Sequence, residues 1–426
     1  MINNVAIIGC GVAGSAAALF LARIGVQVSV FEGNAPDADA GAGLLLQAPA
    51  LAVLHAAGLA AELWQLAAPI EKIGVEFARS KRRFTLAYEP NLRACGVQRA
   101  ALQRVLRGAL AAQTQAGVAW NTRITDVDAH RGLLTGVEDT SLAIAARQTS
   151  LALAARQTSL AIAARPATYG PFDLIIAADG VNSSARRACK RIQCSRQPYP
   201  DGAIVCLATL PDSYQNSRTL TQHFNAGPHV SVWPVGANAP GAPRCVTIAL
   251  PVNADAVAQL AANPSDWLMQ IRQIRPELAA QLAELESLPK LVSYRYSEVS
   301  CSQYFNERVV LIGDAAHAMS PQLGLGAGLA LQDAWCLAQC VQKTNLAQAH
   351  FSQALKSFDL QRRSEANKLQ RISRIVTPLF QSSNPVINFL REPTMRAFAN
   401  NALMQRIALK TLCRAPRDIA LSGIVK

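Results

Sequence analysis

The turn that follows residue 8 constrains this chain more than any other feature. An apolar run of strand length, residues 5–8, leads into Gly-x-Gly-x-x-Gly at Gly9, Gly11 and Gly14, and a second apolar run ends in Glu32. Gly9 permits a tight turn, Gly11 lets a phosphate approach the backbone, and Gly14 lets a helix pack close to the sheet. The spacing therefore predicts a strand–turn–helix–strand unit that binds a dinucleotide, rather than a Gly-rich turn without a ligand.

The helix that begins within this motif supplies the chemistry of the predicted site. Its first N–H groups have no partner inside the helix, and the helix dipole adds positive charge at the same end, so a pyrophosphate is stabilised there. Glu32 stands 18 residues after Gly14, where its carboxylate can accept hydrogen bonds from a ribose. The residues expected to contact the dinucleotide in this unit are Gly9, Gly11, Val12, Ala13, Gly14 and Glu32.

Length and composition favour a large α/β protein. The chain has 426 residues, half of them apolar, which suits one large α/β domain or two interleaved domains. No apolar run reaches the roughly 18 residues that cross a bilayer. Residues 12–22 are assigned to the first helix rather than to a signal peptide, because no basic stretch precedes them.

The cysteines indicate the redox state of the protein's compartment and whether a metal site is expected. The ten cysteines form no Cys-x-x-Cys pair, and Cys336 and Cys340, one helical turn apart, have no obvious further ligands. We therefore expect reduced thiols, a cytoplasmic location and no metal site.

The net charge of +13 narrows the range of partners. The sequence has no long Lys/Arg block with interleaved aromatic residues, so nucleic acid is not expected as a partner. Residues 356–418 hold twelve Lys or Arg residues and four acidic ones. A basic tail of this kind either touches an anionic membrane surface or forms a solvated helical face, and both interpretations stay open.

Hydrophobic periodicity divides the rest of the chain into helices and strands. Helices are expected at residues 50–61, 98–112 and 255–285, and from residue 326 onward with breaks near Pro378, Pro385 and Pro393. Strands are expected at residues 73–77, 84–88, 124–127, 172–178, 203–209, 230–234, 245–251 and 309–312. The strands between residues 200 and 300, separated by Pro/Gly turns, predict a mainly antiparallel second domain.

Three near-identical nonapeptides interrupt this pattern, at residues 140–148, 149–157 and 158–166. Solenoid repeats are usually about 20 residues or longer, so these short units indicate a tandem duplication rather than a repeat fold. We expect a partly helical surface insertion between two strands, with no part in the chemistry. The alternation of apolar residues also permits strands.

Two further motifs give the chain a family resemblance. Asp-Gly-x-x-Ser-x-x-Arg occupies residues 179–186, and Gly-Asp-Ala-Ala-His-x-x-x-Pro-x-x-Gly-x-Gly occupies residues 313–326. With the N-terminal glycine motif they resemble the single-component FAD-dependent aromatic hydroxylases, a family similar to para-hydroxybenzoate, salicylate and ubiquinone-pathway hydroxylases. The resemblance runs from residue 2 to about residue 375 and is interrupted only by the nonapeptides.

This resemblance implies FAD as the cofactor. Asp314 would hydrogen-bond the ribityl chain, and the loop that follows would reach the flavin ring. The N-terminus of the helix near Gly326 would then stabilise negative charge on the pyrimidine edge of the flavin. Leu325 and Gly328 replace the Gln and Asn frequent in the family, so only backbone contacts are expected there. The residues that the resemblance assigns to FAD are Arg99, Asp179, Asp314, Pro321, Gly324, Gly326 and Ala327.

The implied reaction uses NADH or NADPH and O₂ as co-substrates. O₂ would add at C4a of the reduced flavin, and the hydroperoxide would hydroxylate an aromatic substrate, phenolic or a quinone precursor. The protein has to position the substrate and exclude water, so no catalytic side chain is predicted. His317 is expected to fix its loop by hydrogen bonds, and Trp233 either lines the substrate pocket or is an ordinary buried residue. An FAD-dependent reductase of a prenyl chain or other lipid-like substrate, and a non-catalytic flavin-binding protein, are the alternatives.

The predicted fold is α/β: a Rossmann-type FAD-binding domain interleaved with a mainly antiparallel-sheet substrate domain and followed by C-terminal helices. The assigned ranges are 1–70, 97–190 and 300–345 for the FAD-binding domain, with 140–166 as an insertion, 71–96 and 191–299 for the substrate domain, and 346–426 for the helical region. Residues 376–412 also resemble the C-terminal helices of ubiquinone-pathway hydroxylases, which implies peripheral contact with the inner membrane face. The sequence sets no oligomeric state.

Overall fold

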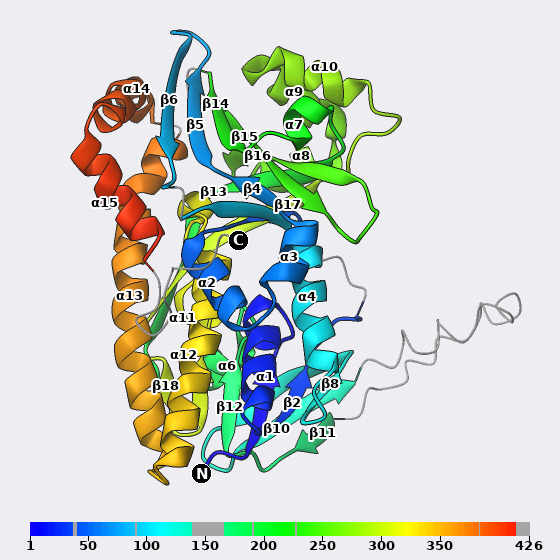
Figure 1. Ribbon diagram of the computed structural model, residues 1–426, viewed down its shortest axis with the longest axis vertical. Coiled ribbons are helices and arrows are strands. Elements are labelled where there is room, and N and C mark those ends of the chain that lie inside the picture. Colours follow the sequence, from blue (N-terminus) through cyan, green and yellow to red (C-terminus); the bar gives the residue numbers. More distant parts are fainter. Residues whose placement is uncertain are drawn as a thin grey trace, which may run out of the picture.

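The structure is a computed structural model that describes residues 1–36, 41–89, 92–138, 166–189, 191–225, 228–382 and 384–414. In the view of Figure 1, a lower region surrounds a parallel sheet and an upper region surrounds a larger, mainly antiparallel sheet. Long helices run along one side of both regions. This arrangement confirms the predicted fold class, whereas the domain boundaries assigned above remain a prediction.

Five parallel strands form the centre of the lower region. Their order is β19 (Val309–Leu311), β12 (Leu174–Ala177), β1 (Asn4–Ile8), β2 (Gln27–Phe31) and β8 (Ala116–Ala119), and β18 (Phe305–Asn306) adds an antiparallel edge. β1 and β12 are runs of buried apolar residues, as parallel strands covered on both faces require. Ile8 pairs with both Ala177 and Phe31. The turns that follow β1, β2 and β12 therefore meet at one edge of the sheet.

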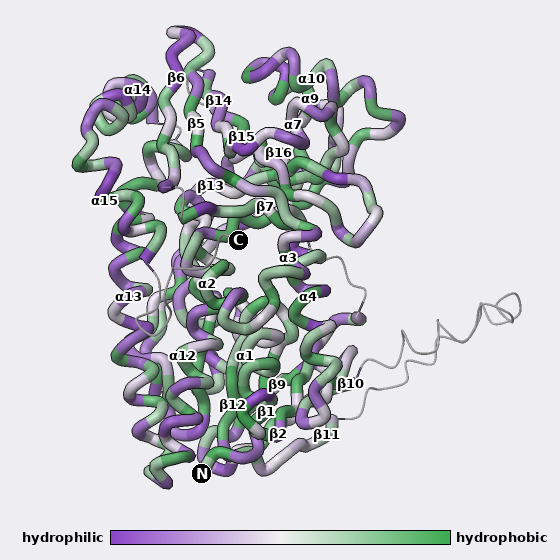
Figure 2. Tube along the Cα trace, viewed as in Figure 1, coloured by the Kyte–Doolittle hydropathy of each residue, from purple (hydrophilic) through white to green (hydrophobic). Residues whose placement is uncertain are grey.

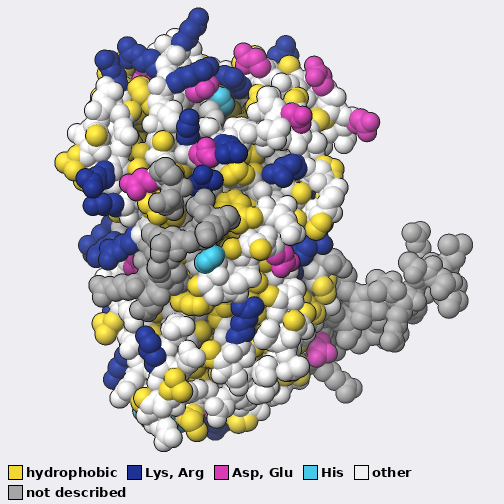
Figure 3. Space-filling model, in the orientation of Figure 1, with side chains coloured by type: hydrophobic (Ala, Val, Ile, Leu, Met, Phe, Trp, Pro, Cys, Tyr) yellow, Lys and Arg dark blue, Asp and Glu magenta, His cyan; other side chains and the backbone are white. Residues whose placement is uncertain are grey.

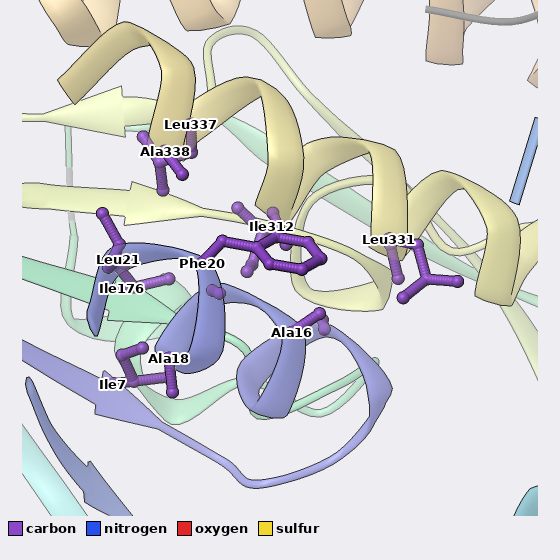
Figure 4. Packing of buried hydrophobic residues seen from close by; sticks show 14 of the residues in the cluster. Ile7, Ala16, Ala18, Phe20, Leu21, Ile176, Ile312, Leu331, Leu337 and Ala338 are labelled. Atoms are coloured by element: carbon purple, nitrogen blue, oxygen red, sulfur yellow. The ribbon is translucent and has the colours of Figure 1, made fainter. Parts of the chain in front are cut away.

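Helix α1 (Val12–Arg23) is buried along almost its whole length, because it packs between this sheet and α12 (Gly326–Leu346). Figure 4 shows α1 with Ile7 and Ile176 of the sheet on one side and Leu331 and Leu337 of α12 on the other. Phe20 meets Trp335 edge to face, with 5.4 Å between ring centroids. Figure 2, coloured by hydropathy, shows mostly green, hydrophobic residues along α1. Helix α4 (Arg99–Ala111) packs beside α1.

The upper sheet has seven strands. Their order is β17 (Val292–Cys301), β13 (Cys194–Ala208), β16 (Arg244–Asn253), β15 (His229–Ala237), β14 (Thr219–Phe224), β5 (Lys72–Phe77) and β6 (Arg82–Ala87), and every pair except β14–β5 is antiparallel. Helices α8 (Val257–Ala262), α9 (Pro264–Ile274) and α10 (Pro276–Ala283) bury apolar residues against this sheet, and Tyr214 of α7 (Asp212–Gln215) packs partly buried against the same cluster. A small sheet of β3 (Gly43–Leu46), β7 (Ala94–Gln98) and β4 (Ala68–Ile70), with α2 (Ala48–Ala56) and α3 (Ala60–Leu66), lies between the two regions.

Three helices end the described chain: α13 (Phe351–Phe380), α14 (Pro385–Ala399) and α15 (Ala402–Leu412). The expected break near Pro378 is confirmed to within two residues, because α13 ends at Phe380. The expected break near Pro393 is wrong, because α14 continues through this residue. Pro385 does begin a helix, where its missing N–H costs nothing. In the described part of the chain, no helix has both the length and the apolar character needed to cross a membrane.

The nonapeptides, whose expected conformation is a partly helical insertion, lie outside the described residues apart from Pro166 at their end. The strands on either side of the nonapeptides are described. β10 (Leu133–Glu138) and β11 (Pro166–Tyr169) pair antiparallel, with Val137 opposite Pro166, and β9 (Thr122–Asp128) completes a three-stranded sheet. The two ends of the repeat segment therefore start from neighbouring strands.

The expectation that all cysteines are reduced thiols is wrong for one pair. Cys194 and Cys301 are register partners on β13 and β17, and their sulfur atoms are joined in a disulfide. No sequence pattern indicates this pair, because 107 residues separate the two cysteines. Only the pairing of β13 with β17 brings them together.

Candidate active site

The turn between β1 and α1 has the shape that the glycine motif predicts. Gly9 has φ +97°, and a Cβ there would lie 2.6 Å from the Ala178 oxygen. At Gly14 a Cβ would lie 1.8 Å from the Gly9 oxygen. A Cβ on Gly11, in contrast, would meet no atom within 4 Å, and no side chain caps the N-terminus of α1. The turn thus needs Gly9 and Gly14 for packing and leaves space at Gly11 beside uncapped N–H groups.

Glu32 lies over this turn, directly after β2. Its Oε2 accepts a hydrogen bond from the Cys10 N–H at 2.7 Å, and its Oε1 accepts from the Asn34 N–H and side-chain amide at 2.9 and 2.7 Å. These bonds fix the carboxylate beside the motif and leave it further lone pairs. The ribose contact expected of Glu32 stays a prediction.

The second motif places Asp314 next to the glycine turn. Gly313 follows β19 with φ +58°, and a Cβ on it would lie 3.1 Å from the Cβ of Ala13. Asp314 then begins the short helix α11 (Asp314–His317), where it is exposed. Within the described ranges its carboxylate makes no hydrogen bond or ion pair. It is therefore available to a ligand bound beside the start of α1.

The loop after α11 leads to a second uncapped helix N-terminus. A 3₁₀ turn (Pro321–Leu323) is followed by Gly324 with φ +62°, and α12 begins at Gly326, where a Cβ would meet nothing within 4 Å. Leu325, which replaces a family Gln, is buried in an apolar cluster and so packs inward. The N–H groups of Gly326 and Ala327 are left at an open helix end.

Arg99 begins α4 directly after β7, the strand that pairs with β3. Its backbone N–H donates to the Ala42 oxygen at 3.1 Å, and a Cβ on Gly41 would lie 3.9 Å from the Arg99 Cδ. The Nε of Arg99 is buried without a hydrogen-bond partner among the described residues. A buried donor of this kind requires an acceptor, and a phosphate or ribityl oxygen would provide one.

Asp179 and Arg186 have structural roles in this chain. Asp179 Oδ2 accepts from the Ser184 N–H and hydroxyl at 2.7 and 3.0 Å, at the start of α6 (Ser184–Ala188). Arg186 is buried and donates to the Ala315 oxygen at 2.7 Å, which ties this motif to α11. Asp179 also lies beside Gly9, but a contact between its carboxylate and FAD remains a prediction.

A buried ionic network, which the sequence analysis missed, supports the loop. His317 Nε2 lies 2.6 Å from Asp333 Oδ2, and the Arg362 Nε lies 2.7 Å from Asp333 Oδ1. Burial alone would raise the pKa of Asp333, but His317 and Arg362 hold it at about 2. The expected structural role of His317 is confirmed. The only sequence signal for Asp333 was a charged residue close to the apolar run Leu329–Leu331 at the start of a predicted helix.

An apolar cluster lies on the upper side of this loop. It joins the loop to the upper sheet and to the end of α15, and its main members are Leu45, Tyr88, Leu220, Trp233, Met319, Leu323, Leu325, Leu409 and Leu412. Two polar features stand within it. The Tyr88 hydroxyl donates to Gln47 Oε1 at 2.7 Å, and the Nε1 of Trp233 is buried with no partner among the described residues.

These features fit FAD. FAD has phosphates, a ribose, a ribityl chain and an electron-accepting ring. The site offers groups that suit these parts: two uncapped helix N-termini, the fixed carboxylate of Glu32, the free carboxylate of Asp314 and the Nε of Arg99, which has no partner among the described residues. The space beside Gly11, which the Cβ of any other residue would occupy, allows a phosphate to approach the backbone. The class that fold and site define is a Rossmann-type flavoprotein with a second, mainly antiparallel sheet over its dinucleotide site.

Comparison with known proteins agrees with that class. A family model described as FAD binding domain matches residues 3–147 and 171–373, and the chain belongs to this family. Salicylate hydroxylase of Pseudomonas putida is 40% identical over 84 residues, which are 20% of this chain and 19% of that protein. A 3-amino-4-hydroxybenzoate 2-monooxygenase of Streptomyces platensis is 26% identical over 396 residues, 87% of each chain.

Solved structures share the whole fold. A structure of 2-methyl-3-hydroxypyridine-5-carboxylic acid oxygenase has a TM-score of 0.74 at 20% identity, covering 99% of this chain and 100% of that one. For p-nitrophenol 4-monooxygenase from Pseudomonas putida the TM-score is 0.74 at 16% identity, covering 97% and 99%. Family and relatives together define an FAD-dependent monooxygenase of the aromatic-hydroxylase type. They do not favour the prenyl-chain reductase.

Proposed function

We propose that this protein hydroxylates an apolar aromatic substrate, phenolic or a quinone precursor, at the expense of NADH or NADPH and O₂, in the cytoplasm. The observation that carries the proposal is the apolar cluster beside the loop of Met319–Leu325, with the partnerless N–H of Trp233 inside it. Unpaired buried donors are costly. A substrate hydroxyl or carbonyl oxygen would satisfy this one while its ring packs against apolar side chains.

Each side chain of the site then has a physical task. The N-termini of α1 and α12, Glu32, Arg99 and Asp314 hold FAD, and bound FAD supplies hydride acceptance and oxygen activation. Trp233 orients the substrate by its N–H, whereas Tyr88 stays protonated and bonded to Gln47, because burial raises its pKa above the usual range of a tyrosine. Leu409 and Leu412 of α15 keep water from this side of the loop.

The test is a coupling measurement on the purified holoenzyme. NADH and NADPH are supplied separately, with a panel of phenols, hydroxyquinolones and quinone precursors, and NAD(P)H oxidation, O₂ uptake and H₂O₂ release are followed together. A true substrate speeds NAD(P)H oxidation and lowers the H₂O₂ released per O₂ consumed, and its product gains one oxygen atom. If no ring compound changes this ratio, the proposal is wrong.

A second part of the proposal is peripheral contact with an anionic membrane through the C-terminal helices. Seven large apolar side chains of α14 and α15 are exposed: Val386, Phe389, Leu390, Phe398, Leu403, Met404 and Ile407. Residues 384–414 contain five Lys or Arg residues and one acid. Figure 3 shows Lys and Arg side chains gathered at the end of the molecule that carries these helices. Apolar area and basic charge together favour an interfacial helix pair.

Vesicle sedimentation tests this contact. Wild-type protein is expected to pellet with phosphatidylglycerol vesicles at low salt, less so at high salt, and poorly with phosphatidylcholine vesicles. Leu403→Ser with Ile407→Ser should weaken binding, while the exposed pair Met269→Ser and Leu346→Ser serves as the control. Absence of sedimentation at low salt contradicts the contact and leaves the hydroxylase proposal intact.

A further inference from the structure

A cavity of about 800 Å³ lies between the β5–β6 hairpin and α14, away from the loop and the apolar cluster described above. Its lining includes the guanidinium groups of Arg79, Arg82 and Arg396 and the rings of Phe77, Phe224 and Phe389. This volume falls in the range of about 300–1,000 Å³ that is usual for small-molecule sites. Basic groups together with aromatic walls suit a ligand that is both anionic and apolar.

Positive charge in this cavity is largely uncompensated. Arg82 lies 3.4 Å from Glu392, the one acid of the lining. Arg79 and Arg396 have no ion pair or side-chain hydrogen bond with any residue in the described ranges. Residues 79–83, at the hairpin tip, contain four Lys or Arg residues and are all exposed. A concave site lined by one sign of charge concentrates ligands of the opposite sign.

Helix α14 buries a charge and exposes apolar side chains. Arg391 is only 2% exposed; its Nε donates to the Leu379 oxygen at 2.6 Å, and its guanidinium lies 5.1 Å from the centre of the Phe224 ring. Phe389 is 80% exposed and Val386 62%. A surface helix in water normally shows the reverse pattern. The outward face of α14 therefore suits apolar surroundings, and Phe389 belongs both to that face and to the cavity lining.

We propose that this cavity binds the phosphate headgroup of an anionic phospholipid, whose acyl chains lie along the outward face of α14. The inference rests on the membrane contact proposed above and names the lipid class that it uses. A free phosphate ester would engage the guanidinium groups but would leave the ring of Phe389, which is 80% exposed, without an apolar partner. A second copy of this chain would bring like charges together at the hairpin tip, which disfavours it.

The decisive experiment uses a lipid that needs no membrane. Dihexanoylphosphatidylglycerol below its micelle concentration is titrated into the holoenzyme by calorimetry, with dihexanoylphosphatidylcholine as the zwitterionic comparison. Arg79→Gln with Arg396→Gln is expected to weaken binding by roughly 25-fold, since each guanidinium contact with the phosphate contributes about 1 kcal/mol. Arg406→Gln with Arg414→Gln removes the same charge from exposed positions outside the cavity lining and should leave the affinity as in wild type.

Flavin content and hydroxylation of a water-soluble substrate, measured in parallel, should be unchanged in both double variants. If both double variants lost lipid affinity equally, the proposed site would be wrong, because the loss would then come from the reduced net charge and not from the cavity. Glycerol 3-phosphate binding as tightly as the lipid would overturn the lipid assignment. If Arg79→Gln with Arg396→Gln still sediments with vesicles and binds the soluble lipid with unaltered affinity, the cavity is not the lipid site. The proposed membrane contact would then remain supported.

Discussion

His317 and Asp333 form a fully buried pair in which Nε2 of the imidazole lies 2.6 Å from the carboxylate Oδ2. The same carboxylate oxygen accepts the Gly313 N–H at 2.8 Å. Asp333 thus ties both ends of α11 to α12, and Arg362 adds α13 through its Nε, 2.7 Å away. Buried ionic contacts therefore anchor α11, which leads into the loop assigned to the flavin, to α12 and α13.

Replacing the carboxylate should weaken this support. Asp333→Asn leaves the buried Arg362 guanidinium with Glu365 as its remaining charge partner and removes the carboxylate that faces His317, so we expect the free energy of unfolding to fall by about 3 kcal/mol and FAD to be lost early in the transition. Urea unfolding followed by flavin fluorescence measures both. Asp212→Asn, an exposed carboxylate on α7, is the control. Unchanged unfolding of Asp333→Asn would show that the network carries no stability.

The glycine turn offers a matched pair of substitutions. Gly11→Ala adds a Cβ that meets no protein atom, so the apoprotein should stay folded while FAD affinity falls roughly tenfold or more. Gly14→Ala places a Cβ 1.8 Å from the Gly9 oxygen and should destabilise the fold by about 3 kcal/mol or more. Thermal unfolding and FAD titration separate the two effects. Full FAD affinity in Gly11→Ala would place the pyrophosphate elsewhere.

Trp233 can be tested as a positioning residue. Trp233→Phe keeps most of the apolar contact but removes the N–H, so KM for the aromatic substrate should rise roughly fivefold, about 1 kcal/mol, and more O₂ should be released as H₂O₂. Trp267 of α9 is the control, because its Nε1 is also buried and partnerless among the described residues but its side chain packs against the upper sheet in another cluster. A similar loss of coupling in Trp267→Phe would indicate a general structural effect.

The nonapeptides should be dispensable. Val137 and Pro166 are opposite each other on β10 and β11, so a short Gly/Ser link can replace residues 140–165 without moving either strand. We expect the shortened chain to keep its flavin content and its NAD(P)H oxidation. Loss of folded protein on expression would mean that the repeats bury surface of the core.

Stability should fall on acidification because of His229. Burial, together with the nearby charge of Arg391, lowers the pKa of His229 from 6.5 to about 3. Between these two values the unfolded chain binds a proton that the folded state excludes, so stability decreases as pH falls, by about 1.4 kcal/mol per pH unit near the middle of the window. His229→Gln should flatten the dependence of the unfolding free energy on pH from 6.5 to 4, with the exposed His55→Gln as the control. An unchanged slope would contradict the assignment.

Local spacing predicted the turn geometry on which the proposed FAD site depends. Gly9, Gly11 and Gly14 act within one turn, and Glu32 ends the very next strand, so their relation depends on the backbone geometry of one β–α–β unit. Apolar runs likewise predicted β1, β12 and β19, because parallel strands covered on both faces need continuous burial. Hydrophobic periodicity located α4 to within a residue at each end.

Tertiary structure decided what depends on contacts between distant segments. Asp333 and Arg362 are 29 residues apart, and Cys194 meets Cys301 only because β13 pairs with β17. Arg391 is buried although it stands between the exposed Leu390 and the charged Glu392, because this side of α14 packs against Phe224. Residue spacing records local backbone geometry, whereas the burial of a charge is set by which helices and strands surround it, and that is a property of the packed fold alone.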